Sequence, residues 1–166
     1  MNAGARIGAL LLAALAPLAH AAGLDAIRVA PAFELAGPGG QVALAQFKGK
    51  LVYLDFWASW CGPCRQSFPW MNEMQAKYGD KGLRIVGVNV DARSEDARGF
   101  LDANPARFTV AFDPQGATPR NYGIKGMPSS VLIDASGKVV FAHTGFREPD
   151  RAALEARIKA ALGAAQ

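Results

Sequence analysis

The chain has 166 residues, of which 51% are hydrophobic and 19% charged, and this composition excludes a disordered or low-complexity protein. Its net charge is +4 and no run of five like charges occurs, so nothing predicts a nucleic-acid-binding surface. Two cysteines are too few for a disulfide-stapled scaffold or a four-cysteine zinc site. They can form one pair, because Cys61 and Cys64 lie only three positions apart.

The amino-terminal segment has the composition of a secretory signal peptide. An apolar stretch over 7–18 follows a single positive charge and leads to a small-x-small site, which predicts a signal peptide over 1–21 with cleavage after Ala21. An uncleaved membrane anchor is the alternative, but a span needs roughly 20 strongly apolar residues, and this stretch is rich in Ala and Gly and contains Pro17. No cysteine stands at the cleavage site, which argues against a lipoprotein anchor. We therefore expect residues 22–166 to form one domain in an oxidising bacterial periplasm.

The first elements of the exported domain are predicted to be strands. Two short apolar runs, 32–36 and 42–47, flank a turn rich in Gly and Pro and predict a strand pair. Residues 51–57 are apolar on both parities, as in a strand covered on both faces. Asp55 is the one charged residue in this predicted strand.

Helices and strands alternate over the rest of the chain. Apolar residues recur at helical spacing from Cys64 to Tyr78, so a helix is expected there, with a kink at Pro69 and an end at Gly79. The later predicted elements are a strand over 83–90, a helix capped by Ser94 and running to about 103, a strand over 108–112, a helical turn over 118–122, strands over 129–133 and 138–143, and a helix from about Pro149. This order predicts a single α/β domain with a mixed sheet.

Cys61 and Cys64 lie where the strand over 51–57 gives way to the helix. Sulfurs three residues apart on the first helical turn can close a small disulfide ring. Unpaired backbone N–H groups and the helix dipole stabilise an anion at that end, which favours a Cys61 thiolate near neutral pH. Cys61 is therefore the predicted nucleophile toward a substrate disulfide. Cys64, one turn into the helix, is predicted to resolve the mixed disulfide that results.

Other uses of the cysteine pair have less support. A structural disulfide across three residues closes too small a loop to constrain the unfolded chain. A zinc site lacks two further ligands, because His143 is the only histidine left after cleavage. Haem attachment needs a histidine directly after the second cysteine, where this chain has Arg65. A Cu(I)-handling protein that uses both thiolates remains an alternative from another functional class. The redox function itself requires no cofactor or metal.

Asp55 and Pro128 are the other candidate catalytic residues, each with a plainer alternative. Asp55 is either a strand-edge carboxylate that reaches solvent or a buried acid beneath the cysteines. Burial would raise its pKa and let it accept the Cys64 proton during resolution. Pro128 either marks the start of a strand or forms a cis peptide bond that leaves the Met127 backbone free to pair with an extended substrate.

Three motifs carry a resemblance to a known family: Phe56-Trp57-Ala58-Ser59-Trp60-Cys61-Gly62-Pro63-Cys64, Phe47-Lys48-Gly49-Lys50, and Gly126-Met127-Pro128-Ser129-Ser130-Val131-Leu132-Ile133-Asp134. With them the chain resembles, over roughly 30–162, the exported TlpA/ResA-like proteins of the thioredoxin superfamily. The resemblance implies a thioredoxin fold with an N-terminal strand pair and a central insertion near 92–122. It also implies that Cys61 attacks, Cys64 resolves, and Pro128 is a cis proline facing them. The predicted substrate-binding residues are Trp60, Gly62, Pro63 and Met127.

Three departures from the family pattern direct the functional prediction. Gly62-Pro63 is the pair found in cytosolic thioredoxin, and Ser67 stands where many relatives carry a glutamate. Asp55 matches the buried aspartate of thioredoxin, where many TlpA-like proteins have asparagine. These differences favour a general thioredoxin-like reductant over a dedicated role in cytochrome c maturation.

The predicted function is an exported thiol-disulfide oxidoreductase that reduces protein disulfides and contributes to cell redox homeostasis. Because the periplasm has no thiol-reducing pool of its own, a membrane thiol electron donor of the DsbD/CcdA kind is the expected partner. A disulfide oxidase or isomerase is the alternative within this class. The expected substrate is a disulfide-bearing protein, and no nucleic acid is expected to bind.

Overall fold

The structure is a computed structural model that describes residue 1 and residues 29–164. The predicted signal segment therefore lies, apart from Met1, outside the described residues. The strands are β1 Glu34–Gly37, β2 Gly40–Ala43, β3 Leu51–Trp57, β4 Leu83–Asn89, β5 Thr109–Phe112, β6 Ser129–Ile133 and β7 Val139–Thr144. The helices are α1 Gly62–Tyr78, α2 Ser94–Ala103, α3 Ala117–Asn121 and α4 Asp150–Gly163, with short 3-10 helices η1 Leu44–Phe47 and η2 Gly79–Lys81. Of these helices, none is both long enough and apolar enough to cross a bilayer.

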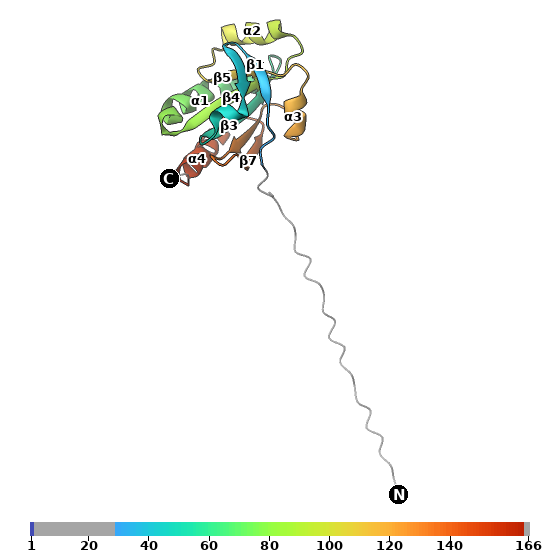
Figure 1. The fold of residues 1–166 in the computed structure, drawn as a ribbon, viewed down its shortest axis with the longest axis vertical. Coiled ribbons are helices and arrows are strands. Elements are labelled where there is room, and N and C mark those ends of the chain that lie inside the picture. The colour runs from blue at the N-terminus through green and yellow to red at the C-terminus, as the bar shows by residue number, and fades with distance from the viewer. Residues whose placement is uncertain (2–28, 165–166) are drawn as a thin grey trace.

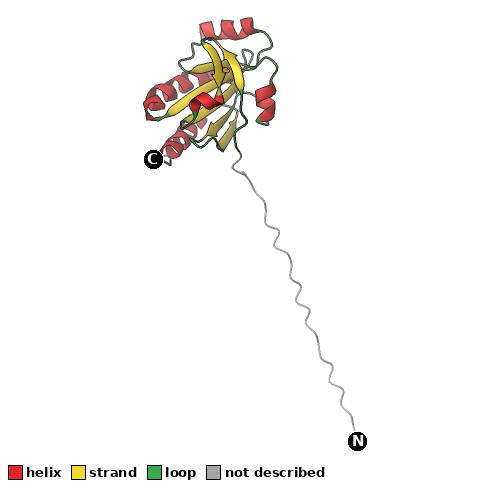
Figure 2. Ribbon diagram, viewed as in Figure 1, coloured by secondary structure: helices red, strands yellow, loops and turns green. Residues whose placement is uncertain are grey.

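The strands form one sheet in the order β2-β1-β5-β4-β3-β6-β7 (Figure 2). β3, β4 and β5 run parallel, whereas β6, β7, β1 and β2 join them through antiparallel pairs. Parallel neighbours need a crossover connection, which α1 supplies between β3 and β4 and α2 between β4 and β5. The mixed sheet, the N-terminal strand pair and the extra elements between β4 and β6 are as the sequence predicts.

β3 lies inside the sheet, and its alternating side chains contribute to two separate apolar cores. All seven of its residues are buried. Leu51, Tyr53 and Trp57 join the core that contains α1 and α4. Val52, Leu54 and Phe56 join the core on the opposite face. Figure 1 shows α1 and α4 on one side of the sheet and α3 on the other. Burial on both faces explains why this strand is apolar on both parities.

Local details differ from the sequence predictions at two places, residues 44–47 and Ser94. Residues 44–47 form η1 instead of extending β2, and the Gln46 side chain accepts a hydrogen bond from the Ala43 N–H at its start. Ser94 is the first helical residue of α2 and not its cap. The helix α1 runs unbroken across Pro69, whose side of the helix is exposed.

Candidate active site

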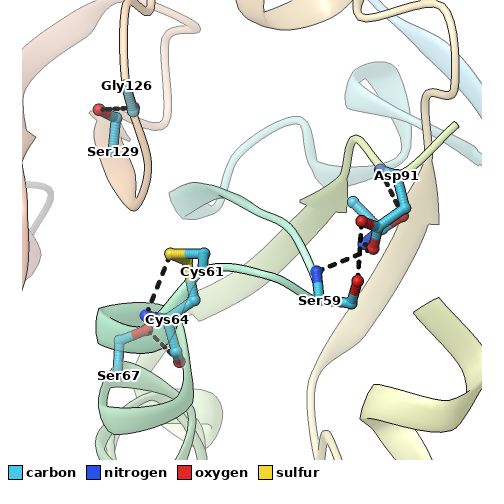
Figure 3. Close-up of a disulfide and its surroundings, with 8 residues drawn as sticks. Ser59, Cys61, Cys64, Ser67, Asp91, Gly126 and Ser129 are labelled. Atoms are coloured by element: carbon cyan, nitrogen blue, oxygen red, sulfur yellow. Dashed lines mark hydrogen bonds between the residues drawn. A yellow bond between two sulfur atoms is a disulfide. The ribbon is translucent and has the colours of Figure 1, made fainter. Parts of the chain in front are cut away.

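The turn between β3 and α1 places Cys61 at the N-terminus of a 17-residue helix. Cys61 is the N-cap residue and has an extended backbone, and Gly62 and Pro63 are the first two helical residues. Proline fits there because the first helical N–H groups have no partner within the helix. The Cys61 Sγ accepts a hydrogen bond from the Cys64 N–H at 3.2 Å (Figure 3), so a sulfur occupies the position of a capping oxygen.

Cys61 and Cys64 form a disulfide, with 5.3 Å between their Cα atoms. Cys61 keeps 4% of its surface exposed and Cys64 keeps none, so a partner protein can reach the pair only through Cys61. Trp60 is 71% exposed, and Gly62 and Pro63 are exposed beside it. The predicted substrate-binding residues of the turn therefore form the surface around the accessible sulfur.

The loop before β6 carries Pro128, and the Met127–Pro128 peptide bond is cis, as predicted. The Ser129 hydroxyl donates to the Gly126 carbonyl at 2.7 Å and ties the loop together. Met127 packs against the apolar core that contains both cysteines. Figure 3 shows the tip of this loop directed toward the turn that holds Cys61. The sequence thus brings residues more than 60 positions apart to one edge of the sheet.

Asp55 is buried, with 2% of its surface exposed, and the prediction of a solvent-reaching strand-edge carboxylate is wrong. It shares the parity of Tyr53 and Trp57 and so lies on the α1 side of β3. Its Oδ2 atom has no hydrogen-bond partner among the residues that the structure describes. Burial raises the pKa of Asp55 well above its usual value. The pKa of Tyr53 is raised as well, first by burial and then by the Asp55 charge.

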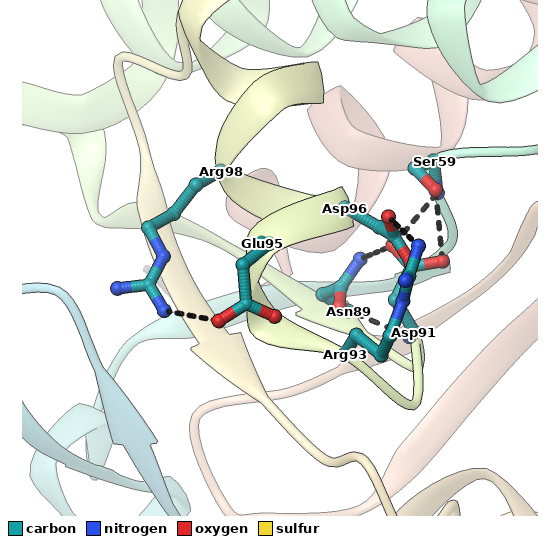
Figure 4. A network of polar contacts seen from close by, with 7 residues as sticks. All are labelled: Ser59, Asn89, Asp91, Arg93, Glu95, Asp96 and Arg98. Atoms are coloured by element: carbon teal, nitrogen blue, oxygen red, sulfur yellow. Dashed lines mark hydrogen bonds and ion pairs between the residues drawn. The ribbon is translucent and has the colours of Figure 1, made fainter.

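Sequence reasoning missed Asp91, which holds the turn from the neighbouring strand. Its Oδ2 accepts hydrogen bonds from the Ser59 N–H at 2.9 Å and the Asn89 Nδ2 at 2.7 Å, and its Oδ1 accepts one from the Ser59 hydroxyl at 3.0 Å (Figure 4). The Asp91 N–H donates to Asn89 Oδ1 at 3.0 Å. Asp91 lies two residues after the end of β4, and the carboxyl ends of parallel strands share one edge of the sheet. The position of Asp91 just after a predicted strand, one that neighbours β3, was the sequence feature that could have identified it.

Two further residues from the sequence analysis, Ser67 and His143, have defined contacts. Ser67, where relatives often carry a glutamate, is buried and donates its hydroxyl to the Cys64 carbonyl at 3.0 Å. His143 lies on β7 in register with Ser130, and its Nε2 is 3.8 Å from Asp150. Among the residues that the structure describes, no group of three or more His, Cys, Asp or Glu side chains could hold a metal ion.

Comparison with known proteins gives a family match over most of the chain. The family model described as Redoxin matches residues 26–159. Thiol-disulfide oxidoreductase ResA from Bacillus thuringiensis subsp. konkukian (strain 97-27) is 39% identical over 102 residues, 61% of this chain and 59% of that protein. The ResA protein of Bacillus subtilis (strain 168) is 34% identical over 117 residues, 70% of this chain and 65% of that protein. The chain thus spans less than two thirds of the length of both relatives.

A solved structure extends the match to the whole fold. The crystal structure of a putative thiol:disulfide interchange protein DsbE from Chlorobium tepidum has a TM-score of 0.82 and 61% sequence identity, and the match covers 84% of this chain and 99% of that one. The predicted thioredoxin-like fold is therefore confirmed. The chain belongs to the redoxin family, as a TlpA/ResA-like member of the thioredoxin superfamily.

Proposed function

We propose that the protein is an exported thiol-disulfide oxidoreductase that reduces disulfides in other proteins. The observation that carries the proposal is the Cys61–Cys64 pair at the N-terminus of α1, in which Cys61 keeps 4% of its surface exposed and Cys64 is fully buried. An accessible nucleophile and a buried partner are what two successive thiol-disulfide exchanges require. Relatives named as thiol-disulfide oxidoreductases support the same chemistry.

The reaction proceeds in two exchanges at the same sulfur. The Cys61 thiolate attacks one sulfur of the substrate disulfide, so that a Cys61–substrate bond forms while the other substrate sulfur leaves as a thiolate and takes up a proton. The Cys64 thiol then loses its proton and attacks the Cys61 sulfur. The bond to the substrate breaks and the second substrate thiolate leaves. Two electrons pass from the cysteine pair to the substrate, and the Cys61–Cys64 disulfide remains.

Asp55 is the proposed acceptor of the Cys64 proton. A carboxylate with an ordinary pKa would be a weak base toward a thiol, because the pKa values of the two groups differ by about 4.6 units. Burial reduces that difference, since it raises the pKa of Asp55. The unpartnered Oδ2 leaves one carboxyl oxygen free to take the proton.

The cis-proline loop and the exposed part of the turn are the proposed contacts with the substrate polypeptide. Pro128 turns the backbone so that Met127 can pair with an extended segment on either side of the substrate disulfide. Trp60, Gly62 and Pro63 are exposed around Cys61 and would cover the mixed disulfide. Backbone pairing of this kind gives affinity without selecting a sequence.

Export and recharging complete the proposal. Residues 1–21 act as a cleaved signal peptide, and residues 22–166 work as one domain in the periplasm. Each turnover leaves the cysteine pair oxidised, so a membrane thiol electron donor of the DsbD/CcdA kind must return two electrons and two protons to it.

The proposal is tested with Cys64→Ser, which leaves the attacking sulfur but prevents resolution. We expect this variant to accumulate mixed disulfides with substrate proteins, and Cys61→Ser, its matched control, to trap none. Wild-type protein recharged with dithiothreitol should reduce insulin. Equilibration with glutathione then tests the direction, because a potential near −120 mV, that of a strong oxidant, would favour the oxidase alternative. Tight Cu(I) binding without insulin reduction would replace the enzyme proposal with the copper one.

A further inference from the structure

A groove of about 320 Å³ lies beside the cis-proline loop, outside the cysteine turn itself. It is lined by Val90, Pro114, Gln115, Gly116, Pro119, Arg120, Ile124, Lys125, Gly126 and Met127. Val90 and Met127 also pack against the apolar core that contains Cys61 and Cys64. The groove is therefore continuous with the loop whose backbone is proposed to pair with the substrate.

The charges of this groove all have one sign. Arg120 and Lys125 are its charged residues, both are exposed, and no carboxylate is among the lining residues. Within residues 29–164, neither cation forms an ion pair, whereas Arg93, Arg147 and Arg151 each have a carboxylate partner. In the described part of the chain, the two groove cations are thus not paired with a carboxylate.

Arg120, one of the residues that line the groove, is held by a hydrogen bond to another lining residue. Its Nη1 donates to the Gln115 carbonyl at 2.7 Å. A Cβ atom at Gly116 would lie 3.3 Å from that nitrogen, so glycine at this position leaves room for the guanidinium, and its positive φ of 63° suits the turn. The nearest carboxylate in sequence, Asp113, is buried beneath the turn and accepts a hydrogen bond from the Thr118 N–H. A positioned guanidinium loses little side-chain freedom when it binds a carboxylate.

The apolar part of the groove limits the kind of ligand further. Val90, Ile124 and Met127 give it an aliphatic lining. Val90 and Met127 of this lining also pack against the core that contains the cysteines. A free small anion would leave that lining uncovered, whereas a peptide segment can place aliphatic carbons on it and a carboxylate near the two cations. The combination fits an extended polypeptide with acidic side chains.

We propose that this groove is a substrate subsite that selects disulfide-bearing polypeptides with acidic residues next to the reacting cysteine. The inference rests on the proposed function and adds a substrate class to it. Substrate chain leaving the Met127 backbone enters the groove, where Arg120 and Lys125 lie within reach of its side chains. At physiological ionic strength the attraction acts over about 8 Å, so only residues close to the disulfide are sensed.

The test uses two peptides that carry the same disulfide, one flanked by three glutamates and the other by three lysines. We expect the wild-type protein to reduce the glutamate peptide with a kcat/KM about tenfold higher, and we expect high salt to remove most of that difference. The double variant Arg120→Gln/Lys125→Gln should bring the ratio close to one. The control Lys48→Gln/Lys50→Gln removes the same charge just before β3, at the opposite end of that strand from the cysteine turn, and should keep the wild-type ratio.

A second measurement separates failure of the subsite from failure of the proposed function. A glutamate peptide with serines in place of its cysteines should bind the oxidised wild-type protein more tightly than the double variant, whatever the activity. A small neutral disulfide should be reduced at equal rates by wild type and both double variants. Equal kcat/KM for the two peptides together with equal binding to the wild type and the double variant would overturn the subsite. If the protein reduced none of these disulfides but still bound the serine peptide more tightly than the double variant does, the proposed reductase function would be overturned and the subsite would stand.

Discussion

Asp55 is a carboxylate at a position where the rest of β3 buries apolar side chains. Its Oδ2 has no partner, and burial alone accounts for the raised pKa. Burying an unpaired polar group costs about 1–3 kcal/mol in proteins, and more if the group is charged. A group with this cost is expected where chemistry requires it, and a proton acceptor beneath a pair of thiols is such a requirement.

The raised pKa of Asp55 predicts how stability depends on pH. Between its pKa in the unfolded chain, about 4, and its higher pKa in the folded protein, the folded state binds more protons. The contribution of Asp55 to the free energy of unfolding is therefore fully present below pH 4. It falls by about 1.4 kcal/mol per pH unit as pH rises, until the pKa of Asp55 in the folded protein is passed. Asp55→Asn should remove this slope. Urea unfolding of the oxidised protein from pH 5 to pH 9 measures it.

Two controls accompany the Asp55 prediction. Asp102→Asn removes an exposed carboxylate of α2 and should leave the slope of the wild-type protein unchanged. Resolution of a preformed Cys61 mixed disulfide should also be slower in Asp55→Asn between pH 6 and pH 9. A slope equal in wild type and Asp55→Asn would show that the buried carboxyl ionises without cost, and an unchanged resolution rate would remove Asp55 from the mechanism.

Asp91 is predicted to act as a positioning residue for the turn that holds Cys61. It accepts both donors of Ser59, two residues before the redox cysteine, so Asp91→Ala leaves three buried or half-buried donors without a partner. We expect a loss of about 2–4 kcal/mol in stability and at least a tenfold loss in insulin reduction. Ser59→Ala removes one of these bonds and should cost about 1 kcal/mol.

A double-mutant cycle separates positioning from simple destabilisation. If Asp91 acts through Ser59, the effects of Asp91→Ala and Ser59→Ala on insulin-reduction kcat/KM are not additive, and Ser59→Thr, which keeps the hydroxyl, rescues most of the activity. Additive losses in kcat/KM that simply follow stability would leave Asp91 with a structural role alone.

At the scale of elements, Gly87 on β4 and Gly99 in α2 allow the same substitution to be compared in a crowded and in an open position. A Cβ atom at Gly87 on β4 would lie 2.9 Å from the Phe108 ring and 3.2 Å from Trp57 Nε1, both inside the core that packs under α1. Gly99, inside α2, has nothing within 4 Å of the same atom. Gly87→Ala should therefore destabilise the protein by about 1–3 kcal/mol, because this core cannot accept the added volume.

Gly99→Ala makes the same chemical change but is expected to alter the free energy of unfolding in the opposite direction. It adds a methyl group to an exposed helix interior and should stabilise the protein by about 0.5–1 kcal/mol. Chemical denaturation of both variants measures the two shifts. If Gly87→Ala left the stability unchanged, β4 and Phe108 would have to move apart easily. The close packing between β4 and the aromatic core would then not constrain the sheet.

Most elements could be predicted from the sequence because each one repeats a local pattern. The run of β3 that is apolar on both parities and the helical spacing from Cys64 to Tyr78 are properties of single segments. The bond between Ser59 and Asp91 joins residues 32 positions apart, and it exists because β3 and β4 are parallel neighbours. No pattern within either segment carries that pairing.

Across the whole molecule, the candidate site also has one part that a single segment predicts and another that only the folded chain brings together. The cysteine turn is one continuous motif, so its residues could be named from the sequence alone. The groove with Arg120 and Lys125 is assembled from the loops around α3 and the end of β4, and its single sign of charge depends on where those loops meet. Net charge could not reveal it, because +4 over 166 residues says nothing about position.

The direction of electron flow is a property of the whole molecule, because it depends on how folding and disulfide formation are linked. In a protein that reduces others, the folded state must favour the disulfide more than the unfolded chain does. This preference is about 1.4 kcal/mol for each 30 mV by which the reduction potential of the folded protein lies below that of the unfolded chain. In the described part of the chain, Cys61 Sγ accepts one hydrogen bond, from the Cys64 N–H, and Cys64 is fully buried. Asp55 adds a buried acid on the same side of β3. A buried Cys64 and a nearby buried acid disfavour a second thiolate beside that of Cys61, and this favours the disulfide.

We therefore expect the oxidised protein to unfold at a higher urea concentration than the protein reduced with dithiothreitol. The comparison is made at pH 7 with Cys61→Ser/Cys64→Ser as the control, which should show the same midpoint with and without the reductant. A strong oxidant behaves in the opposite way, because its reduced form is the more stable one. A reduced protein more stable than the oxidised protein would thus reverse the proposed direction, while the chemistry at Cys61 and Cys64 would stand.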